Sequence, residues 1–415
     1  MNIYFSKAIN SLYFYDTRVT FPLEIPVVKS GSGFSFVISC MCNGINSIER
    51  IAEELIRKYN VKESMDTVRE VILSNTVNDK SIKKAFTLDI NEANLAPRVN
   101  GSFEKKYPQI IHIELTNTCN YMCTQCYKNA QQRGIYIEYN SLKEKIYDKF
   151  KGVIPVIHFT GGEPTIHKNF QEIVDLFHRD YSLQLTTNGS RIISYPIDVF
   201  KKFEAIDISL YGLSAEEYRI NTGSGNSFYL VKEGCMKLKD SNIDFSVTVV
   251  LNNENWSQME DYVQYAIEVG AESIGLALPM QSGKLLTTTT DKWNLSQDTK
   301  KLIYRNFRDI QKRYGEKIKI LNWTRNGYSD MWKMTSVDDS LRCGAGKHTW
   351  WMSEKFTFRP CAFLPDEYVN LDYNTWIACL SNNYRIDWKE ARNTLELFAS
   401  DHNLNLTDLC PIFRE

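Results

Sequence analysis

Apolar positions between residues 108 and 283 are spaced as strands that alternate with helices. Six near-continuously apolar runs are predicted as strands, at 110–115, 153–159, 183–187, 205–210, 245–251 and 273–278. Helical spacing occurs between them, at 142–150, 170–178, 197–203, 229–239 and 256–269. Such alternation predicts a parallel sheet covered by helices. Six units favour an α/β fold in the form of an open, partial (β/α)6 TIM-like barrel, with its chemistry at the C-terminal strand ends.

The first 95 residues have a different pattern and are predicted as a small separate domain. Short strands are expected at 11–15, 23–28 and 34–39, divided by turn signals. Two helices follow, one starting at an Asn46 or Ser47 N-cap and one over 61–73. Three strands and two helices indicate a winged-helix-like unit, and the polar segment 79–102 is predicted to be a linker.

The chain after about residue 284 is less regular, with one helix expected near 299–314 and loops beyond it. We therefore expect three parts. They are an N-terminal domain at 1–95, the partial barrel at 105–310, and an irregular α+β extension at 311–415.

Composition narrows the class of protein. The 415 residues are 43% hydrophobic and 24% charged, which is typical of globular proteins. A formal net charge of -1 argues against general nucleic-acid binding. No apolar run approaches the roughly 18 residues of a membrane span, and no export signal pattern is present. We expect a cytoplasmic protein with no nucleic-acid or membrane partner.

Ten cysteines are the unusual feature of the composition. In a chain without an export signal they are expected to be thiols, metal ligands or catalytic groups rather than disulfides. Cys40 and Cys42 share one face of a predicted strand, and Cys235 lies in an amphipathic helix. These three are predicted to be ordinary core residues.

Three further cysteines stand close together in the loop after the first barrel strand. Cys119, Cys123 and Cys126 have the spacing C-x3-C-x2-C. Soft thiolates suit zinc or iron–sulfur centres. A closed zinc site needs a fourth ligand nearby, and His112 is not obviously directed into the loop. An iron–sulfur cluster with one open iron is therefore favoured, with zinc as the alternative.

This triplet, in this position, resembles the fingerprint of the radical S-adenosylmethionine (radical SAM) superfamily. Gly161, Gly162 and Glu163, followed by proline at the end of the second strand, are similar to that family's GGEP segment. The resemblance implies that the triplet holds a 4Fe–4S cluster whose open iron binds SAM. It also implies reductive cleavage of SAM to a radical that abstracts a hydrogen atom from a substrate.

Further strand ends match places where the family holds the ribose and methionine portions of SAM. They are Thr187 and Asn188 after the third strand and Ser209 on the fourth. Arg219 is a candidate to pair with the SAM carboxylate through its fork, and a surface arginine is the alternative. One departure from the family is Gln125, which stands where an aromatic residue often precedes the third cysteine.

The sequence around two later cysteines resembles the opening of the extension called SPASM, or twitch in its shorter form. That extension binds auxiliary iron–sulfur clusters, with seven cysteines for two clusters in the full form. The four cysteines that remain here are Cys343, Cys361, Cys379 and Cys410. The resemblance therefore implies one auxiliary cluster at most. For Cys379 and Cys410 a thiol that donates a hydrogen atom, as in radical SAM epimerases, is a competing role, and a buried free cysteine is another.

The N-terminal 95 residues resemble a RiPP recognition element, the module that binds precursors of ribosomally made, modified peptides. The resemblance implies that the leader of a precursor peptide adds as a strand to a sheet, so that main-chain hydrogen bonds give affinity. The alternative is a structural cap that binds nothing.

Together the resemblances imply an oxidoreductase that abstracts a hydrogen atom from a leader-bound precursor peptide and installs a thioether or carbon–carbon cross-link. An external donor such as flavodoxin or ferredoxin would supply the electron. The alternatives are a peptide epimerase, a radical SAM enzyme acting on a small molecule or protein side chain, and a non-catalytic iron–sulfur protein that binds peptide or senses redox state. Glu114, Asp207 and His158 are candidate acids or bases by position alone, and structural roles are expected for them.

Overall fold

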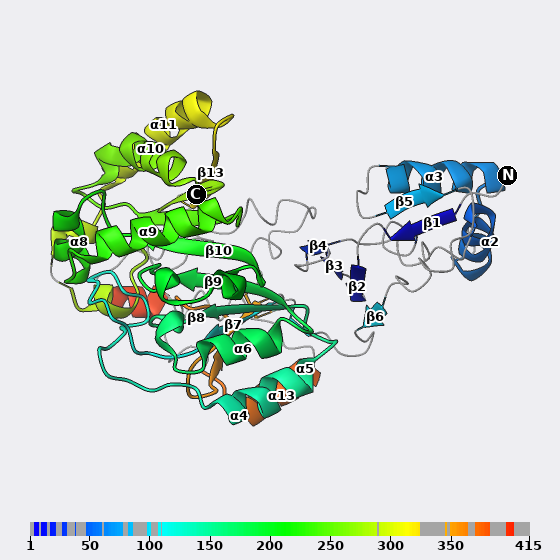
Figure 1. Cartoon of the computed structure of the whole chain (residues 1–415), viewed down its shortest axis with the longest axis horizontal. Coiled ribbons are helices and arrows are strands. Elements are labelled where there is room, and N and C mark those ends of the chain that lie inside the picture. Colours follow the sequence, from blue (N-terminus) through cyan, green and yellow to red (C-terminus); the bar gives the residue numbers. More distant parts are fainter. Residues whose placement is uncertain are drawn as a thin grey trace.

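The computed structural model of the chain shows a large α/β part and a smaller N-terminal part (Figure 1). The described residues are 4–7, 10–14, 17–21, 27–30, 38, 47–59, 62–77, 82–85, 98–100, 107–108, 110–288, 290–323, 345–346, 349–363, 370–381 and 396–401. Cys40, Cys42, Cys343 and Cys410 lie outside them, so the predictions for these four cysteines are not tested.

A nine-stranded sheet organises the large part. Its strands are β7 (Ile110–Glu114), β8 (Val156–Thr160), β9 (Ser182–Thr187), β10 (Phe203–Leu210), β11 (Ser246–Val250), β12 (Ser273–Ala277), β13 (Lys319–Trp323), β14 (Thr349–Met352) and β15 (Phe358–Arg359). Their order is β13-β12-β11-β10-β9-β8-β7-β14-β15. All neighbours run parallel except β14 and β15. The expected α/β fold with a mostly parallel sheet is therefore confirmed.

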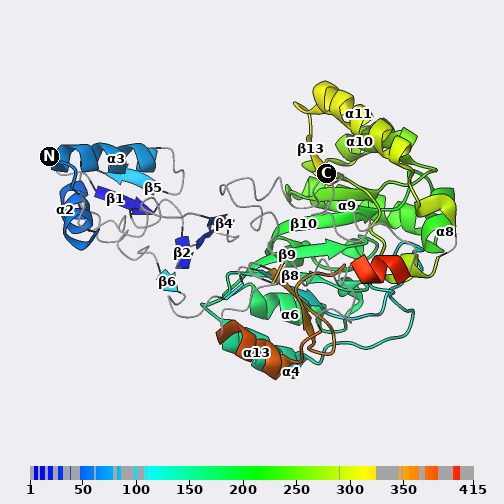
Figure 2. The same ribbon diagram turned by 180° about the vertical axis from the view of Figure 1, so that it is seen from behind.

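Helices follow the strands and cover one face of the sheet (Figures 1 and 2). They are α4 (Tyr139–Leu142), a π-helical turn (Lys143–Tyr147), α5 (Asp148–Phe150), α6 (Phe170–Phe177), α7 (Ile197–Phe200), α8 (Ala215–Thr222), α9 (Ser227–Asp240), α10 (Met259–Val269), α11 (Gln297–Tyr314) and α13 (Tyr373–Ser381). Short 3-10 turns span Pro164–Ile166, Ile192–Ser194, Trp256–Gln258, Gly283–Leu286 and Asp291–Trp293. No described helix is long and apolar enough to cross a membrane.

The two faces of the barrel strands differ in burial. On β9, β10 and β11 the residues that face the helices, such as Leu185, Ile208 and Val247, are fully buried in the main core. The alternate residues, such as Thr186, Asp207 and Thr248, are only partly buried. Side chains alternate across a strand, so these polar residues share the face that the helices leave uncovered. We call it the inner face.

The sheet is longer than the sequence pattern indicated. β13 pairs with β12 at one edge and β14 pairs with β7 at the other, so segments that follow the barrel strands in sequence extend the sheet at both edges. The boundary expected at residue 310 falls inside α11. The expectation of loops after the last predicted helix is wrong for β13, β14, β15 and α13. Helix α13 packs on the hairpin, with Phe358 stacked on Trp376 at 3.9 Å.

The described residues of the N-terminal part form two small sheets and the helices α2 and α3. β1 (Tyr4–Lys7) pairs antiparallel with β5 (Ile82–Ala85). β2 (Asn10–Phe14), β3 (Thr17–Phe21) and β4 (Val27–Ser30) form an antiparallel ladder, to which β6 (Arg98–Asn100) adds parallel to β2. α2 (Ile48–Tyr59) and α3 (Met65–Val77) share a separate apolar cluster that includes Ile51, Leu55 and Ile72.

Two expectations for this part are wrong. Segment 79–102 contains β5 and β6 and is not only a linker, because strands at its two ends pair with segments far back in the sequence. Ile38, expected within a strand at 34–39, is helical and buried in the α2–α3 cluster. A short apolar run has no period that separates a strand from a helix, which explains this error. The expected N-cap is confirmed at Ser47, whose hydroxyl accepts a hydrogen bond from the Arg50 amide.

Candidate functional site

The three clustered cysteines lie in the loop that follows β7, at the carboxyl edge of the sheet. Cys119 and Cys123 are buried, Cys126 is partly buried, and all three belong to one packed group with Tyr121 and Ala130. The backbone amide of Tyr121 donates to the Cys119 sulfur, and that of Ala130 donates to the Cys126 sulfur, both at a distance of 3.3 Å. The loop therefore gathers three sulfurs and gives two of them amide donors.

The surroundings of these thiols favour a positively charged occupant. Burial, together with Glu163 and Cys126, raises the pKa of the Cys119 thiol to about 12. Burial and the two neighbouring thiols also raise the pKa of Cys123. Three crowded thiolates repel one another, so they are stable as ligands only around a cationic group. Three soft thiolates in one loop fit an iron–sulfur cluster. The described residues contain no group of three His, Cys, Asp or Glu placed to hold a single metal ion.

Gly161 and Gly162 hold the end of β8 against the cysteine loop. The Gly162 amide donates to the Thr116 carbonyl oxygen at 2.7 Å, and the Glu163 amide donates to the Thr118 carbonyl oxygen at 2.9 Å. A Cβ on Gly162 would lie 2.1 Å from the Thr118 oxygen, and one on Gly161, whose φ is +125°, would lie 2.5 Å from the Thr116 oxygen. The lack of a side chain at these glycines allows a close backbone approach, and the partner of that approach is the cysteine loop itself.

Glu163 joins β8 to the end of β9 through a buried carboxylate. Its oxygens accept hydrogen bonds from the Thr165 amide and hydroxyl, from the Thr187 hydroxyl at 2.6 Å and from the Asn188 amide at 2.7 Å. Burial raises the pKa of this carboxyl group in spite of these donors. The carboxylate therefore fixes the Thr187–Asn188 turn beside the glycine segment.

Asn188 links that turn to the first cysteine. Its side-chain amide donates to Asn120 at 2.9 Å and lies 3.9 Å from the Cys119 sulfur. Ser190 donates to the Asn188 oxygen and accepts from Asn120, which closes a partly buried ring of polar contacts. Gly161, Gly162, Glu163, Thr187 and Asn188, singled out from the sequence, thus converge on the cysteine loop.

The other two residues predicted for SAM lie in different settings. Ser209 is on the inner face of β10, one residue from the strand's carboxyl end. Arg219 is in α8, with its side chain 63% exposed and paired with Glu216 at 2.5 Å. The described contacts of Arg219 are with this neighbour rather than with the cysteine loop, so its position matches the surface alternative.

Three acids and bases noted from the sequence have separate environments. His158 on β8 bonds the Thr186 hydroxyl through Nε2 at 2.8 Å, and burial lowers its pKa to about 4. Asp207 on β10 accepts from the Thr248 hydroxyl at 2.8 Å, and burial raises its pKa to about 6. Glu114 at the end of β7 is fully buried and belongs to an ion-pair network.

That network connects the extension to the cysteine loop and was not foreseen from the sequence. Lys128 is paired with both Glu114 and Glu354, the second at 2.7 Å, and Arg359 pairs with Glu114 at 3.2 Å. Lys128 follows Cys126 by two residues, and Arg359 precedes Cys361 by two. Their closeness to the cysteines was the one sign in the sequence that these two residues matter. It does not reveal their partners, because the ion pairs Lys128–Glu354 and Glu114–Arg359 join segments more than 200 residues apart.

Aromatic side chains reinforce the same contact. Trp351 of β14 stacks on His112 of β7, with ring centroids 4.1 Å apart. Tyr127, next to Cys126, meets Trp351 and Phe363 edge-on at 5.9 and 5.8 Å. The hairpin that leads to Cys361 is therefore packed directly on the cysteine loop.

The remaining predicted ligands are only partly described. Cys361 follows β15, and its sulfur accepts from the Phe363 amide at 3.5 Å. Cys379 lies in α13, where burial raises the pKa of its thiol. Because Cys343 and Cys410 are outside the described residues, the auxiliary set stays a prediction. Cys235 is buried in α9, as expected of a core residue.

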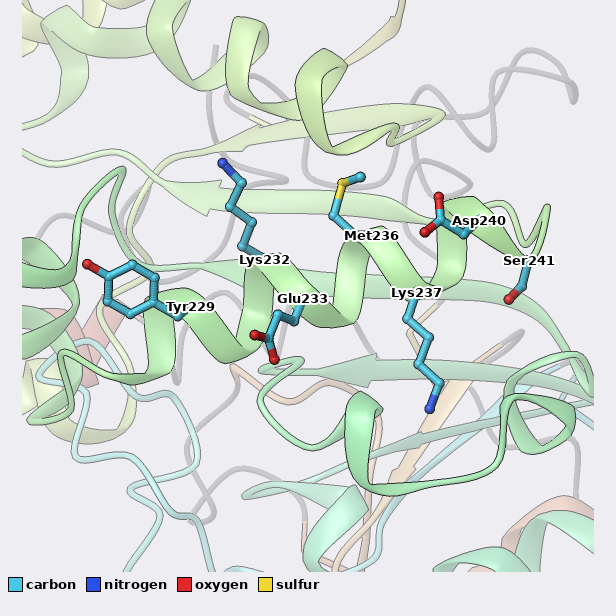
Figure 3. Close-up of a pocket in the computed structure, with 7 residues that line it drawn as sticks. All are labelled: Tyr229, Lys232, Glu233, Met236, Lys237, Asp240 and Ser241. Atoms are coloured by element: carbon cyan, nitrogen blue, oxygen red, sulfur yellow. The ribbon is translucent and has the colours of Figure 1, made fainter.

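A surface hollow of about 540 Å³ is separate from this site. Figure 3 shows its lining along α9, where Tyr229, Lys232 and Met236 project from the helix together with four further residues. Helix α9 covers the outer side of the sheet, so the hollow does not include the cysteine loop. We assign the chemistry to the carboxyl edge of the sheet.

An open parallel α/β sheet with three cysteines after its first barrel strand, held by a glycine segment after the second, is the arrangement of radical SAM domains. Residues 113–266 match the model of the Radical SAM superfamily. This part of the chain is therefore a radical SAM domain, for which the superfamily implies a 4Fe–4S cluster and SAM. The resemblance seen in the sequence is confirmed to this extent.

Particular relatives extend the comparison. The subtilosin biosynthesis protein AlbA of Bacillus subtilis is 22% identical over 277 residues, which are 65% of this chain and 59% of AlbA. An uncharacterized protein of Methanocaldococcus jannaschii is 29% identical over 180 residues, 40% of this chain and 61% of that protein. The chain thus spans about three fifths of the length of these curated relatives.

Solved structures show a similar fold over nearly the whole chain. Streptococcus suis SuiB bound to its precursor peptide SuiA matches with a TM-score of 0.59 at 11% identity, covering 91% of this chain and 88% of SuiB. SuiB bound to S-adenosylmethionine matches with a TM-score of 0.58 at 13% identity, covering 98% and 94%. At these identities the likeness concerns the fold alone.

Proposed function

We propose that this chain is a radical SAM enzyme that modifies a ribosomally made precursor peptide. The observation that carries the proposal is the buried three-thiol loop, fixed by the glycine segment and Glu163 at the carboxyl edge of the sheet. When bound, the cluster supplies one electron that cleaves SAM into methionine and a 5′-deoxyadenosyl radical, which removes a hydrogen atom from the substrate.

The residues of the chain then have distinct tasks in this proposal. Cys119, Cys123 and Cys126 would hold the 4Fe–4S cluster, which would bind SAM. Backbone groups of Gly161 to Glu163, which contact the cysteine loop directly, would lie beside the methionine portion of SAM. Thr187, Asn188 and Ser209 would contact the remainder of SAM, and Arg219 would pair with its carboxylate only after leaving Glu216.

A peptide substrate is supported by two relatives. AlbA serves the biosynthesis of a bacteriocin, and SuiB was solved with its precursor peptide. We propose that residues 1–95 act as a RiPP recognition element that binds the leader of the precursor. β4 and β6 are the edge strands of the four-stranded sheet, and no described strand pairs with their outer sides, to which an extended peptide can add.

The extension has a supporting role in the same proposal. Cys361, with Cys343, Cys379 and Cys410, would hold one auxiliary iron–sulfur cluster in a twitch-like or SPASM-like domain. That cluster would bind the peptide or accept an electron during formation of a thioether or carbon–carbon cross-link. The direct packing of the Cys361 hairpin on the SAM-cluster loop supports this. A cytoplasmic flavodoxin or ferredoxin would supply the first electron.

The test is a reaction of the anaerobically reconstituted protein with SAM, a reductant and the small peptide encoded beside its gene. We expect 5′-deoxyadenosine and a peptide lighter by two hydrogen atoms, measured by liquid chromatography and mass spectrometry. Cys235→Ala is the matched control, because this buried cysteine lies in α9 away from the loop, and it should retain both products.

Other outcomes separate the alternatives. A peptide of unchanged mass that has gained solvent deuterium would contradict cross-linking and support epimerisation. Deoxyadenosine without any change in the peptide would point to a different substrate. A protein that binds peptide and carries clusters but never cleaves SAM would contradict the enzyme itself.

A further inference from the structure

Asp207 is a carboxylate on the inner face of the sheet, and the functions assigned above to other residues do not involve it. It lies on β10 two residues before Ser209, and its side chain is only partly buried. Its register neighbours are Thr186 on β9 and Ser246 on β11. The Thr248 hydroxyl donates to Oδ1, and within the described residues no hydrogen bond reaches Oδ2.

The other carboxylates on strands β7 to β12 are engaged elsewhere. Glu114 is fully buried between Lys128 and Arg359, which neutralise it. Glu204 is the second residue of β10, at the opposite end of the sheet from the cysteine loop, and accepts a hydrogen bond from Ser182. Among these strands, Asp207 is thus the carboxylate that faces the inner side without a described cation.

The nearby bases are less suited to take up a proton. His112 is stacked on Trp351 at a centroid distance of 4.1 Å, and the ring of His158 lies tilted against it at 4.7 Å. His158 has its Nε2 engaged with Thr186. Burial lowers the pKa of both imidazoles, so each is a weak base.

We propose that Asp207 is the catalytic base that accepts the proton lost by the peptide during cross-linking. This inference rests on the proposed function. The substrate carbon radical forms a bond to the sulfur or carbon of a second peptide group, the S–H or C–H bond of that group breaks, and its proton goes to Asp207. An oxidised iron–sulfur cluster held by the enzyme's cysteines would accept the remaining electron. Two hydrogen atoms are thereby lost, one to deoxyadenosine and one as a proton plus an electron.

The environment of Asp207 fits that task. A base works best when its pKa lies near the working pH, because it is then ionised and still holds a proton. Burial raises the pKa of Asp207 to about 6. The side chains that face it from β9 and β11 are the uncharged Thr186, Ser246 and Thr248, and the titratable group beyond them is His158.

Asp207→Asn tests the inference, because it retains the shape and the Thr248 contact but removes the base. With peptide and SAM, we expect deoxyadenosine to form within about twofold of the wild-type rate. The yield of cross-linked peptide should fall by about 100-fold or more. In the wild type, cross-linking should rise with pH through about 6, and the residual activity of Asp207→Asn should not show this rise.

The controls separate this inference from the proposed function. Glu204→Gln, which changes the other β10 carboxylate, should cross-link normally, and Asp207→Glu should recover part of the activity. Iron content and circular dichroism establish that each variant is folded and loaded. Normal cross-linking by Asp207→Asn, or parallel loss of deoxyadenosine and product in a loaded Asp207→Asn protein, would overturn the inference. Absence of product from the wild type would instead overturn the proposed function.

Discussion

Gly162 shows how the absence of a side chain positions the site. Its amide bonds the cysteine loop, and its Cα lies so close to that loop that a methyl group would overlap the Thr118 carbonyl oxygen at 2.1 Å. The Thr118 oxygen belongs to the backbone, and two hydrogen bonds hold this part of the loop to the end of β8. It therefore cannot move aside as the end of a flexible side chain does. The glycine therefore sets the distance between β8 and the loop that holds the thiols.

Gly162→Ala should accordingly displace the cysteine loop. We expect a loss of about 1–3 kcal/mol in the free energy of unfolding, as for other overpacked sites. Iron bound per chain after reconstitution should also fall, because the loop holds the ligands. Urea unfolding and iron analysis measure the two effects. A variant with wild-type stability and iron content would show that the loop is not held by this contact.

The raised pKa of Asp207 predicts how the stability of the folded protein changes with pH. Its folded-state pKa of about 6 is above the ordinary 3.8, so the folded state binds the proton more tightly than the unfolded state. The contribution of this carboxyl group to the free energy of unfolding is therefore most favourable below pH 3.8 and is lost as the pH rises through 6. Asp207→Asn, which is never charged, should be more stable than the wild type at pH 8 by about 3 kcal/mol.

This difference should shrink to about half by pH 5, where the wild-type carboxyl is largely protonated in the folded state. Denaturant unfolding of both proteins at several pH values measures it. A difference that does not change between pH 8 and pH 5 would contradict the burial of an ionised carboxylate at this position.

At the scale of elements, the β14–β15 hairpin joins the extension to the barrel. β14 pairs parallel with β7, and the hairpin supplies Glu354 and Arg359 to the ion network around Glu114 and Lys128. Lys128 is only 9% exposed and touches two carboxylates that are nearly or fully buried. Removing it leaves two negative charges in the interior with Arg359 as their described cation.

Lys128→Met should therefore be strongly destabilising, by about 3–5 kcal/mol, because unpaired buried charges are costly. Lys232→Met is the matched control, since Lys232 pairs with Glu268 across an exposed surface, and it should cost less than about 1 kcal/mol. Equal stability losses for the two lysine variants, measured by denaturant unfolding, would show that the network does not seat the hairpin.

Local patterns in the sequence predicted the barrel strands and the site formed by the three clustered cysteines, because both depend on residues close together in the chain. Ile111, Ile113 and Leu115 mark a buried strand by themselves, and the glycines mark a close approach. The sequence did not reveal that β14 lies beside β7 or that Arg359 meets Glu114, because such pairings join distant segments and have no local period. For the same reason 79–102 was expected as a linker although β5 and β6 pair far back along the chain.

At the scale of the whole molecule, the apolar cluster of the N-terminal part shares no residues with the main cluster of the barrel. One includes Ile51, Leu55 and Ile72 of α2 and α3, and the other fills the barrel. Separate cores are expected to fold as separate units, so leader binding and SAM cleavage should be separable. Deletion of residues 1–95 should weaken peptide binding at least tenfold while SAM cleavage without peptide persists.

Fluorescence polarisation with a labelled precursor peptide measures the binding, and chromatography of deoxyadenosine measures the cleavage. An affinity that does not change on deletion would contradict the recognition role of the N-terminal part. Loss of deoxyadenosine together with binding would show that the two parts do not act separately.

The central claim is that Cys119, Cys123 and Cys126 hold a cluster that cleaves SAM. The most direct measurement is deoxyadenosine formed from SAM and dithionite by anaerobically reconstituted protein, compared with the triple alanine variant and with Cys235→Ala. We predict deoxyadenosine from the wild type and from Cys235→Ala, and none from the triple variant. Deoxyadenosine from the triple variant, or none from an iron-loaded wild type, would contradict the account.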